Sequence, residues 1–397
     1  MGNVVHLDVD TFPKELQLML SIMKLDSHGG NSILSLLDQD TDWDGFLQFV
    51  RHHRVFPQIY LTLCRIGGGG VPQFVMQSLQ QEYKRNTMLM LSLCAEMNRI
   101  CGNFAEKQIP ILVLKGPVLA MDLYGDISKR TSRDLDFLIQ VKDLERVEEL
   151  LLSYGYVCEE EDYKTVFNEW KWRRYHISYV HPEKQITVEI HWRLGHGPGL
   201  EPNFRDLWER RRSHPQTPAN VFYLGKEDLF AYLVSHGARH SWFRLRWLED
   251  IRRLLYQDLE WGKVVQLLKK NQILHIGGQS ILLASELLDA PIHKEIQKLA
   301  LRRRARKLSQ QALVFIREKV NLHKDPPDYL AAMHIRYLFS IKSLLHKLLF
   351  ILSFFHPYPR DVETFPLPAK LHFLYFPLRP FLWAWRKNMS GNRRTQS

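Results

Sequence analysis

Residues 134–139 read Asp134-Leu135-Asp136-Phe137-Leu138-Ile139, a short apolar run that opens with two acidic residues two positions apart. The run predicts a β-strand over residues 135–140, and side chains two apart on a strand point to the same face. Two like charges side by side cost free energy unless a cation binds them. The stretch therefore predicts a strand that offers a pair of carboxylates to a divalent metal ion.

A glycine lies upstream of this acidic pair. Residues 109–114 form a β-branched run that predicts a buried strand, and Lys115-Gly116 then leads into a predicted helix over residues 116–124. Glycine lets a backbone approach a phosphate closely, and the start of a helix offers free N–H groups. Because Arg130 and Arg133 add positive charge nearby, the segment predicts a nucleotide-phosphate site beside the metal site.

A third acidic residue follows in a predicted β-hairpin. Residues 175–180 and 185–192 alternate in polarity around a Pro-Glu-Lys turn, which is typical of two paired strands. Glu189 lies among apolar residues of the second strand, where a carboxylate needs a partner, so it is the candidate third metal ligand. His191 shares its face, and His176 on the first strand is a candidate base for an acceptor hydroxyl.

Helical periodicity surrounds this central segment. Apolar residues recur every three or four positions before residue 105 and again after residue 225, and residues 329–354 predict one long helix. The chain is therefore predicted to be an α+β protein, with a mixed α/β core between predominantly helical N-terminal and C-terminal regions. The predicted divisions are 1–104 (helical), 105–200 (α/β core), 201–355 (helical) and 356–397 (a tail rich in proline and aromatic residues, with a disordered end).

The composition is that of a globular protein with an anionic partner. Of 397 residues, 45% are hydrophobic and 24% are charged, and the formal net charge is +11. A surplus of positive charge favours a nucleotide, a nucleic acid, a polyphosphate or an anionic membrane surface. The four cysteines show no zinc-binding spacing and the N-terminus shows no signal-peptide pattern, so a cytoplasmic location is expected.

Taken in order, these motifs resemble the uncharacterised nucleotidyltransferase family of the DNA-polymerase-beta-like superfamily, found in bacterial biosynthetic clusters. The resemblance spans roughly residues 40–290. It rests on Ile109-Pro110, Leu114-Lys115-Gly116, Leu123-Tyr124, Arg130, Asp134 to Ile139, Gly155-Tyr156, Val188-Glu189-Ile190-His191-Trp192, His236 to Trp242 and Trp247 to Ile251.

The resemblance implies a metal-dependent transfer of a nucleoside monophosphate from an NTP to a small-molecule, peptide or glycan-type acceptor. The implied catalytic triad, which would hold Mg²⁺ or Mn²⁺, is Asp134, Asp136 and Glu189. The expected nucleotide-binding residues are Gly116, Lys115, Arg130, Ser132 and Arg133. The expected acceptor-side residues are His191, His176 and His236.

Pro117 departs from the family pattern, in which a small polar residue follows the glycine. Proline suits the first turn of a helix, but the hydroxyl that commonly meets a phosphate is missing at this position. Lys115 or Ser132 is the expected substitute.

Other interpretations stay open at this point. The chain could be a catalytically silent relative that binds a nucleotide or a carrier, or a basic module that binds nucleic acid, which the resemblance disfavours. His236 and His240 are spaced like metal ligands on a helix, but more simply predict packing or acceptor-orienting histidines. The aromatic and basic tail is compatible with peripheral contact with an anionic membrane, but its prolines oppose one continuous amphipathic helix, and packing back on the helical core fits it equally well.

Overall fold

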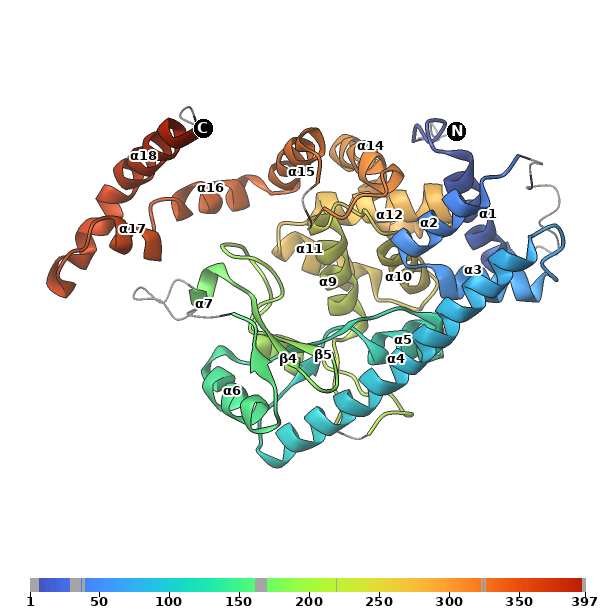
Figure 1. Ribbon diagram of the computed structural model, residues 1–397, viewed down its shortest axis with the longest axis horizontal. Coiled ribbons are helices and arrows are strands. Elements are labelled where there is room, and N and C mark those ends of the chain that lie inside the picture. The colour runs from blue at the N-terminus through green and yellow to red at the C-terminus, as the bar shows by residue number, and fades with distance from the viewer. Residues whose placement is uncertain are drawn as a thin grey trace.

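The computed structural model describes residues 7–28, 37, 40–160, 170–218, 220–322, 324 and 326–394. Figure 1 shows a small sheet with helices packed on it, a larger helical body, and an arm of helices that leads the chain away from that body to the C-terminus. The chain is an α+β protein, as the sequence predicts.

A five-stranded mixed sheet forms the centre of the α/β part. Its strands lie in the order β1-β2-β5-β4-β3, in which β2 and β5 run parallel and the other neighbouring pairs run antiparallel. The bounds are β1 (Leu112–Val113), β2 (Asp134–Leu138), β3 (Val157–Cys158), β4 (His176–His181) and β5 (Ile186–His191). The order confirms the predicted hairpin, which is β4 and β5, and it places the acidic strand β2 directly beside β5.

One face of the sheet is apolar and covered by helices. Leu135, Phe137, Val188 and Ile190 are fully buried in a core shared with the helices α4 (Gln73–Glu106) and α6 (Leu144–Ser153). The buried residues of α4 that reach this core recur every three or four positions, namely Met90, Leu93, Met97, Ile100 with its neighbour Cys101, and Phe104. Because successive strand residues point to opposite sides, the acidic residues of β2 and β5 lie on the other face.

Helices from distant parts of the chain share a second core. The N-terminal ones are α1 (Lys14–His28), α2 (Trp43–His53) and α3 (Phe56–Arg65). The later ones are α8 (Phe204–Glu209), α9 (Lys226–Arg239), α10 (Leu245–Leu255), α11 (Trp261–Lys270), α12 (Leu274–Leu288), α13 (Lys294–Ala300) and α14 (Arg303–Arg317). Their buried apolar side chains form one cluster, so the two predicted helical regions form a single helical body.

The short elements α5 (Pro117–Tyr124) and η2, a 3₁₀ helix (Ile127–Lys129), connect the sheet to this body. The 3₁₀ helix η3 (Val141–Asp143) leads from β2 into α6, and α7 (Trp170–Arg173) precedes β4. The helix α5 follows β1 as predicted and ends at Gly125, which adopts the left-handed conformation with φ 69°.

The C-terminal arm differs from the single helix predicted over residues 329–354. The chain forms α15 (Asp328–Ser340) and α16 (Leu344–Ser353), because Ser343 caps α16 by accepting a hydrogen bond from the backbone N–H of His346. The arm continues with α17 (Pro359–Thr364), the 3₁₀ helix η4 (Ala369–Leu374) and α18 (Tyr375–Arg394). The predicted disordered end thus falls partly in α18 and otherwise outside the described residues.

A membrane span was not expected from the sequence. Within the described part of the chain, no helix combines the length and the hydropathy that crossing a bilayer requires.

Candidate functional site

Asp136 and Glu189 lie side by side on the polar face of the sheet. The parallel register pairs these two residues, so both carboxylates leave the same face at the same level. Nε2 of His191 lies 3.2 Å from Oδ1 of Asp136 and 3.1 Å from Oε2 of Glu189. Ligand atoms of the three residues all lie within 4.8 Å of one another, so the sheet assembles a compact group that could hold a metal ion.

Lys115 balances the negative charge of this group. Its Nζ lies 2.8 Å from Oδ1 of Asp136, and the two side chains are 12% and 0% exposed. Burial acts to lower the pKa of Lys115, but the charge of Asp136 outweighs it and raises that pKa above its ordinary value. Burial likewise acts to raise the pKa of Glu189, but the hydrogen bond with His191 and the charge of Lys115 lower it to about 2. Glu189 is therefore ionised at neutral pH.

The donor atoms of the group fit a divalent cation. Oδ2 of Asp136 and Nδ1 of His191 are buried and have no hydrogen-bond partner among the described residues, although buried polar atoms are normally paired. Burial acts to lower the pKa of His191, and its hydrogen bonds with Asp136 and Glu189 raise it overall. Carboxylate oxygens suit Mg²⁺ and Mn²⁺, and an imidazole beside them also suits softer divalent ions such as Zn²⁺. The two carboxylates are thus compatible with Mg²⁺ or Mn²⁺.

Asp134 lies on the same face but outside this compact group. It is the first residue of β2 and is paired with Thr187 rather than with an acid. Its Oδ1 accepts a hydrogen bond from Oγ of Ser132 at 3.3 Å. The structure thus places His191, which the sequence assigned to the acceptor side, beside the two central carboxylates, and places Asp134 next to Ser132.

Gly116 joins β1 to α5 through a backbone conformation that favours glycine. Its φ is 83° and its ψ is −142°, a region that residues with side chains rarely adopt. A Cβ added there would lie 3.5 Å from the backbone oxygen of Asp134, which is an ordinary contact, so conformation and not crowding requires glycine. Pro117 follows as the first residue of α5, where the missing N–H costs no hydrogen bond.

Gly116→Ala is expected to lower the free energy of unfolding by about 1–3 kcal/mol, the usual cost of this backbone conformation for a residue with a side chain. Gly262→Ala is the matched control, because Gly262 lies inside α11 and a Cβ added to it meets nothing within 4 Å. That change should be neutral or slightly stabilising. Urea unfolding of both variants measures the difference, and equal stabilities would mean that the positive φ of Gly116 carries no cost.

Arg130 has a partner other than the predicted phosphate. Its guanidinium is 1% exposed and donates two hydrogen bonds to Asp250 of α10, at 2.8 Å and 2.9 Å. The hydroxyl of Tyr124 donates to the same carboxylate at 2.8 Å. Burial acts to lower the pKa of Arg130, but the charge of Asp250 raises it above its ordinary value. The predicted phosphate contact is therefore replaced by a buried ion pair that joins the α/β core to the helical body.

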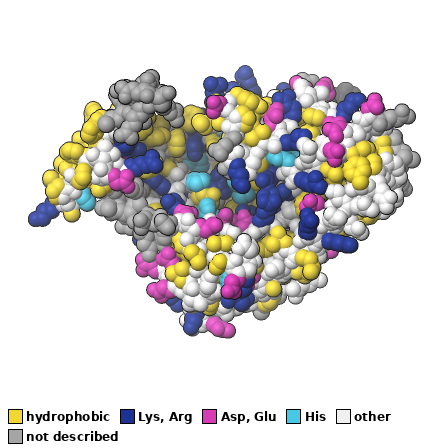
Figure 2. Space-filling view, in the orientation of Figure 1, with side chains coloured by type: hydrophobic (Ala, Val, Ile, Leu, Met, Phe, Trp, Pro, Cys, Tyr) yellow, Lys and Arg dark blue, Asp and Glu magenta, His cyan; other side chains and the backbone are white. Residues whose placement is uncertain are grey.

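Ser132 and Arg133 line a basic pocket of about 330 Å³, whose wall also carries Arg51, Arg54 and Arg85. Arg54, Arg85 and Arg133 form no ion pair with any residue that the structure describes. Figure 2 shows Lys and Arg side chains, with histidines, gathered around the hollow at the centre of the molecule. The sequence predicted Ser132 and Arg133 as nucleotide-binding residues but missed Arg51, Arg54 and Arg85. These come from α2, its C-terminal cap and α4, which lie far from residues 132–133 in the sequence. The overall positive charge was the only signal for them.

His176 lies against the candidate metal-binding group of Asp136, Glu189 and His191. Its ring stacks on that of His191 with the centroids 5.0 Å apart, and its Nε2 lies 3.9 Å from Oε1 of Glu189. Burial, followed by the charge of His191, lowers the pKa of His176 to about 4, so its ring is neutral at pH 7.

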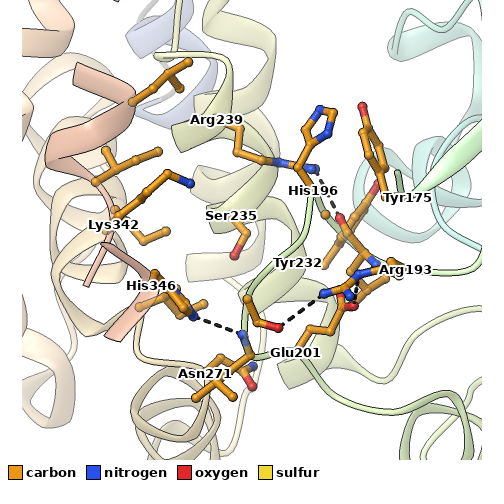
Figure 3. Close-up of a pocket in the computed structure, with 18 of the residues that line it drawn as sticks. Tyr175, Arg193, His196, Glu201, Tyr232, Ser235, Arg239, Asn271, Lys342 and His346 are labelled. Atoms are coloured by element: carbon orange, nitrogen blue, oxygen red, sulfur yellow. Dashed lines mark hydrogen bonds and ion pairs between the residues drawn. The ribbon is translucent and has the colours of Figure 1, made fainter. Parts of the chain in front are cut away.

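A larger cavity of about 640 Å³ lies next to this group. Figure 3 shows Tyr175, His196, Tyr232 and Arg239 along its wall. The ring of Tyr175 lies 5.5 Å from that of His191, which places the cavity within one side chain of the proposed metal ligands.

His236 packs inside the helical body and does not line this cavity. Its side chain is buried, and its ring contacts those of Tyr232, His240 and Trp247 at 5.8, 4.5 and 5.7 Å. Burial, followed by the charge of Lys115, lowers the pKa of His236 well below its ordinary value. Packing is therefore the interpretation that fits His236, whereas His240 reaches the cavity wall.

The family model described as "Uncharacterised nucleotidyltransferase" matches residues 39–289, which is more than half of the chain. The match includes the whole sheet, the candidate metal-binding group, Gly116 and the basic pocket, and it ends before the C-terminal arm. No curated protein and no solved structure matches the chain.

Proposed function

Because the chain belongs to this uncharacterised nucleotidyltransferase family, we propose that it moves a nucleoside monophosphate from an NTP to an acceptor hydroxyl with Mg²⁺ or Mn²⁺. The observation that supports this most strongly is the side-by-side placement of Asp136 and Glu189 with His191. In the reaction, a bond forms between the acceptor oxygen and the α-phosphorus. The bond from the α-phosphorus to the bridging oxygen breaks, and pyrophosphate leaves.

The proposed metal ligands are Asp136, Glu189 and His191, with Asp134 at the edge of the site. A bound divalent ion would supply positive charge to the phosphate oxygens. Lys115, which contacts Asp136, adds further positive charge at the same place. The hydroxyl proton would pass to the neutral ring of His176 and then to water, because the low pKa of that ring favours release.

The triphosphate is proposed to extend toward the basic pocket. Ser132 lies within hydrogen-bond distance of Asp134 and also lines that pocket, so the pocket starts where the acidic face of the sheet ends. Arginine pairs well with phosphate oxygens because its planar guanidinium presents several donors. Gly116 also lies beside Asp134, because a Cβ added to it would lie 3.5 Å from the backbone oxygen of that residue, and the start of α5 that follows offers N–H donors.

Arg133→Gln is expected to weaken NTP binding by about tenfold or more, since a hydrogen bond to a charged group contributes about 1.5–3 kcal/mol. Arg85→Gln should act in the same direction. The matched control is Arg205→Gln, because Arg205 is exposed on α8 and pairs only with its neighbour Glu209 among the described residues. Calorimetric titration with NTP and Mg²⁺ gives the affinities. Wild-type affinity in both pocket variants would contradict the assignment of this pocket to the triphosphate.

The transfer itself is tested by incubating the protein with each labelled NTP, Mg²⁺ and candidate acceptors, and by following pyrophosphate release. Label that moves to an acceptor supports a nucleotidyltransferase. If NTP binds in a metal-dependent way and no acceptor is ever labelled, the chain is instead a silent relative that binds nucleotide.

A further inference from the structure

The large cavity next to the metal-binding group has two unlike walls. Its inner wall comes from Tyr175 just before β4, from the segment that follows β5, which carries His196, and from α9, which carries Tyr232 and Arg239. Its outer wall comes from α15 and α16 of the C-terminal arm (Figure 3). The arm is fixed at this place, because Nε2 of His346 accepts a hydrogen bond from the backbone N–H of Leu200 at 3.0 Å.

Two cations of the cavity lack acidic partners. Arg239 and Lys342 line it, and neither forms an ion pair with a described residue. The acids of the wall are already paired, Glu201 with Arg193 at 2.6 Å and Asp228 with Arg210 at 2.7 Å. Arg239 and Lys342 therefore leave two positive charges on the wall that no described carboxylate neutralises.

Arg239 shows this deficit most clearly. Its Nη2 donates to the backbone oxygen of Leu194 at 3.2 Å, but its Nε and Nη1 are buried without a hydrogen-bond acceptor among the described residues. Burying such donors unpaired costs free energy. Its charge is also felt by its neighbours, since burial and then Arg239 lower the pKa of Lys342, and the same two causes lower that of His196 to about 4. An anionic group between Arg239 and Lys342 would accept hydrogen bonds from the unpaired donors of Arg239 and would offset the repulsion between the two positive charges.

Apart from His334, Lys342 and His346, the outer wall is apolar. Its apolar residues are Ile335, Leu338, Phe339, Ile341 and Phe350. Ile335 and Phe339 are 68% and 41% exposed, and the neighbouring surface of α16 adds the exposed Leu348 and Ile351. Large exposed apolar side chains that line a pocket indicate a surface that a ligand covers.

From these two walls we propose that the cavity binds an amphiphile, a small molecule with an anionic head group and an alkyl chain. The anion lies between Arg239 and Lys342, and the chain lies along α15 and α16. Its role as the acceptor, whose head group presents the hydroxyl to the metal-binding group, rests on the proposed nucleotidyl transfer. Binding of the amphiphile does not depend on that function.

The binding test uses dodecyl phosphate below its micelle concentration, with inorganic phosphate and dodecyl maltoside as comparisons, in calorimetric titrations without NTP. Dodecyl phosphate should bind at least tenfold more tightly than either comparison compound, because each buried methylene raises the affinity severalfold.

Arg239→Gln and Lys342→Gln should each weaken the binding of dodecyl phosphate by about tenfold. Phe339→Ser should reduce the advantage over inorganic phosphate, and Arg205→Gln should change nothing. Phe339 is exposed, so this variant keeps the test valid if Arg239→Gln fails to fold. Equal binding of dodecyl phosphate and inorganic phosphate would overturn the proposal, as would wild-type affinity in all three cavity variants.

Two further arms separate the possible outcomes. Sedimentation of the protein with phosphatidylglycerol vesicles is compared with sedimentation with phosphatidylcholine vesicles. Binding to phosphatidylglycerol that Arg239→Gln abolishes identifies a lipid head group as the source of the anion. If vesicles never compete with dodecyl phosphate, the ligand is a free amphiphile. Asp136→Asn should abolish metal-dependent NTP binding and keep dodecyl phosphate binding. Dodecyl phosphate binding without any transfer activity would sink the nucleotidyltransferase proposal alone, whereas NTP transfer without amphiphile binding would sink this inference alone.

Discussion

Asp136→Asn is expected to reduce nucleotidyl transfer by about a thousandfold or more, which corresponds to roughly 4 kcal/mol of lost transition-state stabilisation. The amide keeps the shape of the side chain but removes the charge that faces Lys115 and His191. It also replaces one of the two oxygens with a donor, which no cation can use as a ligand. The rate is measured as transfer from labelled NTP, and ion binding as the quenching of the Mn²⁺ paramagnetic resonance signal.

Asp134→Asn is the matched comparison for this prediction. Asp134 lies on the same strand and face but outside the compact group, so its loss should cost less activity than that of Asp136. Thermal unfolding of both variants shows whether the fold survives. Transfer that persists in Asp136→Asn would remove this carboxylate from the chemistry.

Arg130→Met is expected to lower the free energy of unfolding by about 3–5 kcal/mol, because it leaves the carboxylate of Asp250 buried without its cation. Arg130 and Asp250 are 1% and 0% exposed, and they hold the α/β core against α10 of the helical body. The hydroxyl of Tyr124 is the one remaining partner of that carboxylate that the described structure shows. Urea unfolding measures the loss.

The double variant Arg130→Met with Asp250→Leu separates charge from packing. Replacing both members of a buried pair by apolar residues is often neutral or stabilising, so much of the lost stability should return. The exposed pair of Arg205 and Glu209 serves as the control, and its removal should cost about 0–1 kcal/mol. A single Arg130→Met variant as stable as wild type would show that the pair does not hold the two parts together.

Local patterns in the sequence predicted the sheet and its acidic face. The alternation of residues 185–192 predicted the second hairpin strand, and with it the face on which Glu189 and His191 lie. The Asp134 and Asp136 spacing predicted a strand with both acids on one side, which β2 confirms. These predictions succeeded because strand polarity is a property of neighbouring residues.

Contacts between distant segments could not be predicted from the sequence. The partner of Arg130 lies 120 positions away in α10, and neither residue has a local pattern that names the other. The basic pocket and the amphiphilic cavity combine side chains from elements that meet only after the helical body has assembled. The break between α15 and α16 depends on one serine cap within an otherwise continuous apolar pattern.

The long helix α4 restricts movement of the helical body relative to the α/β core. Its 34 residues make a rod about 50 Å long. Val75 and Leu79 near its start belong to the core of the helical body, while Met97 and Phe104 near its end belong to the core under the sheet. A hinge that opened the halves would have to bend this rod and break its backbone hydrogen bonds. The distance between the pocket arginines and the acidic strand β2 is therefore fixed before any ligand binds.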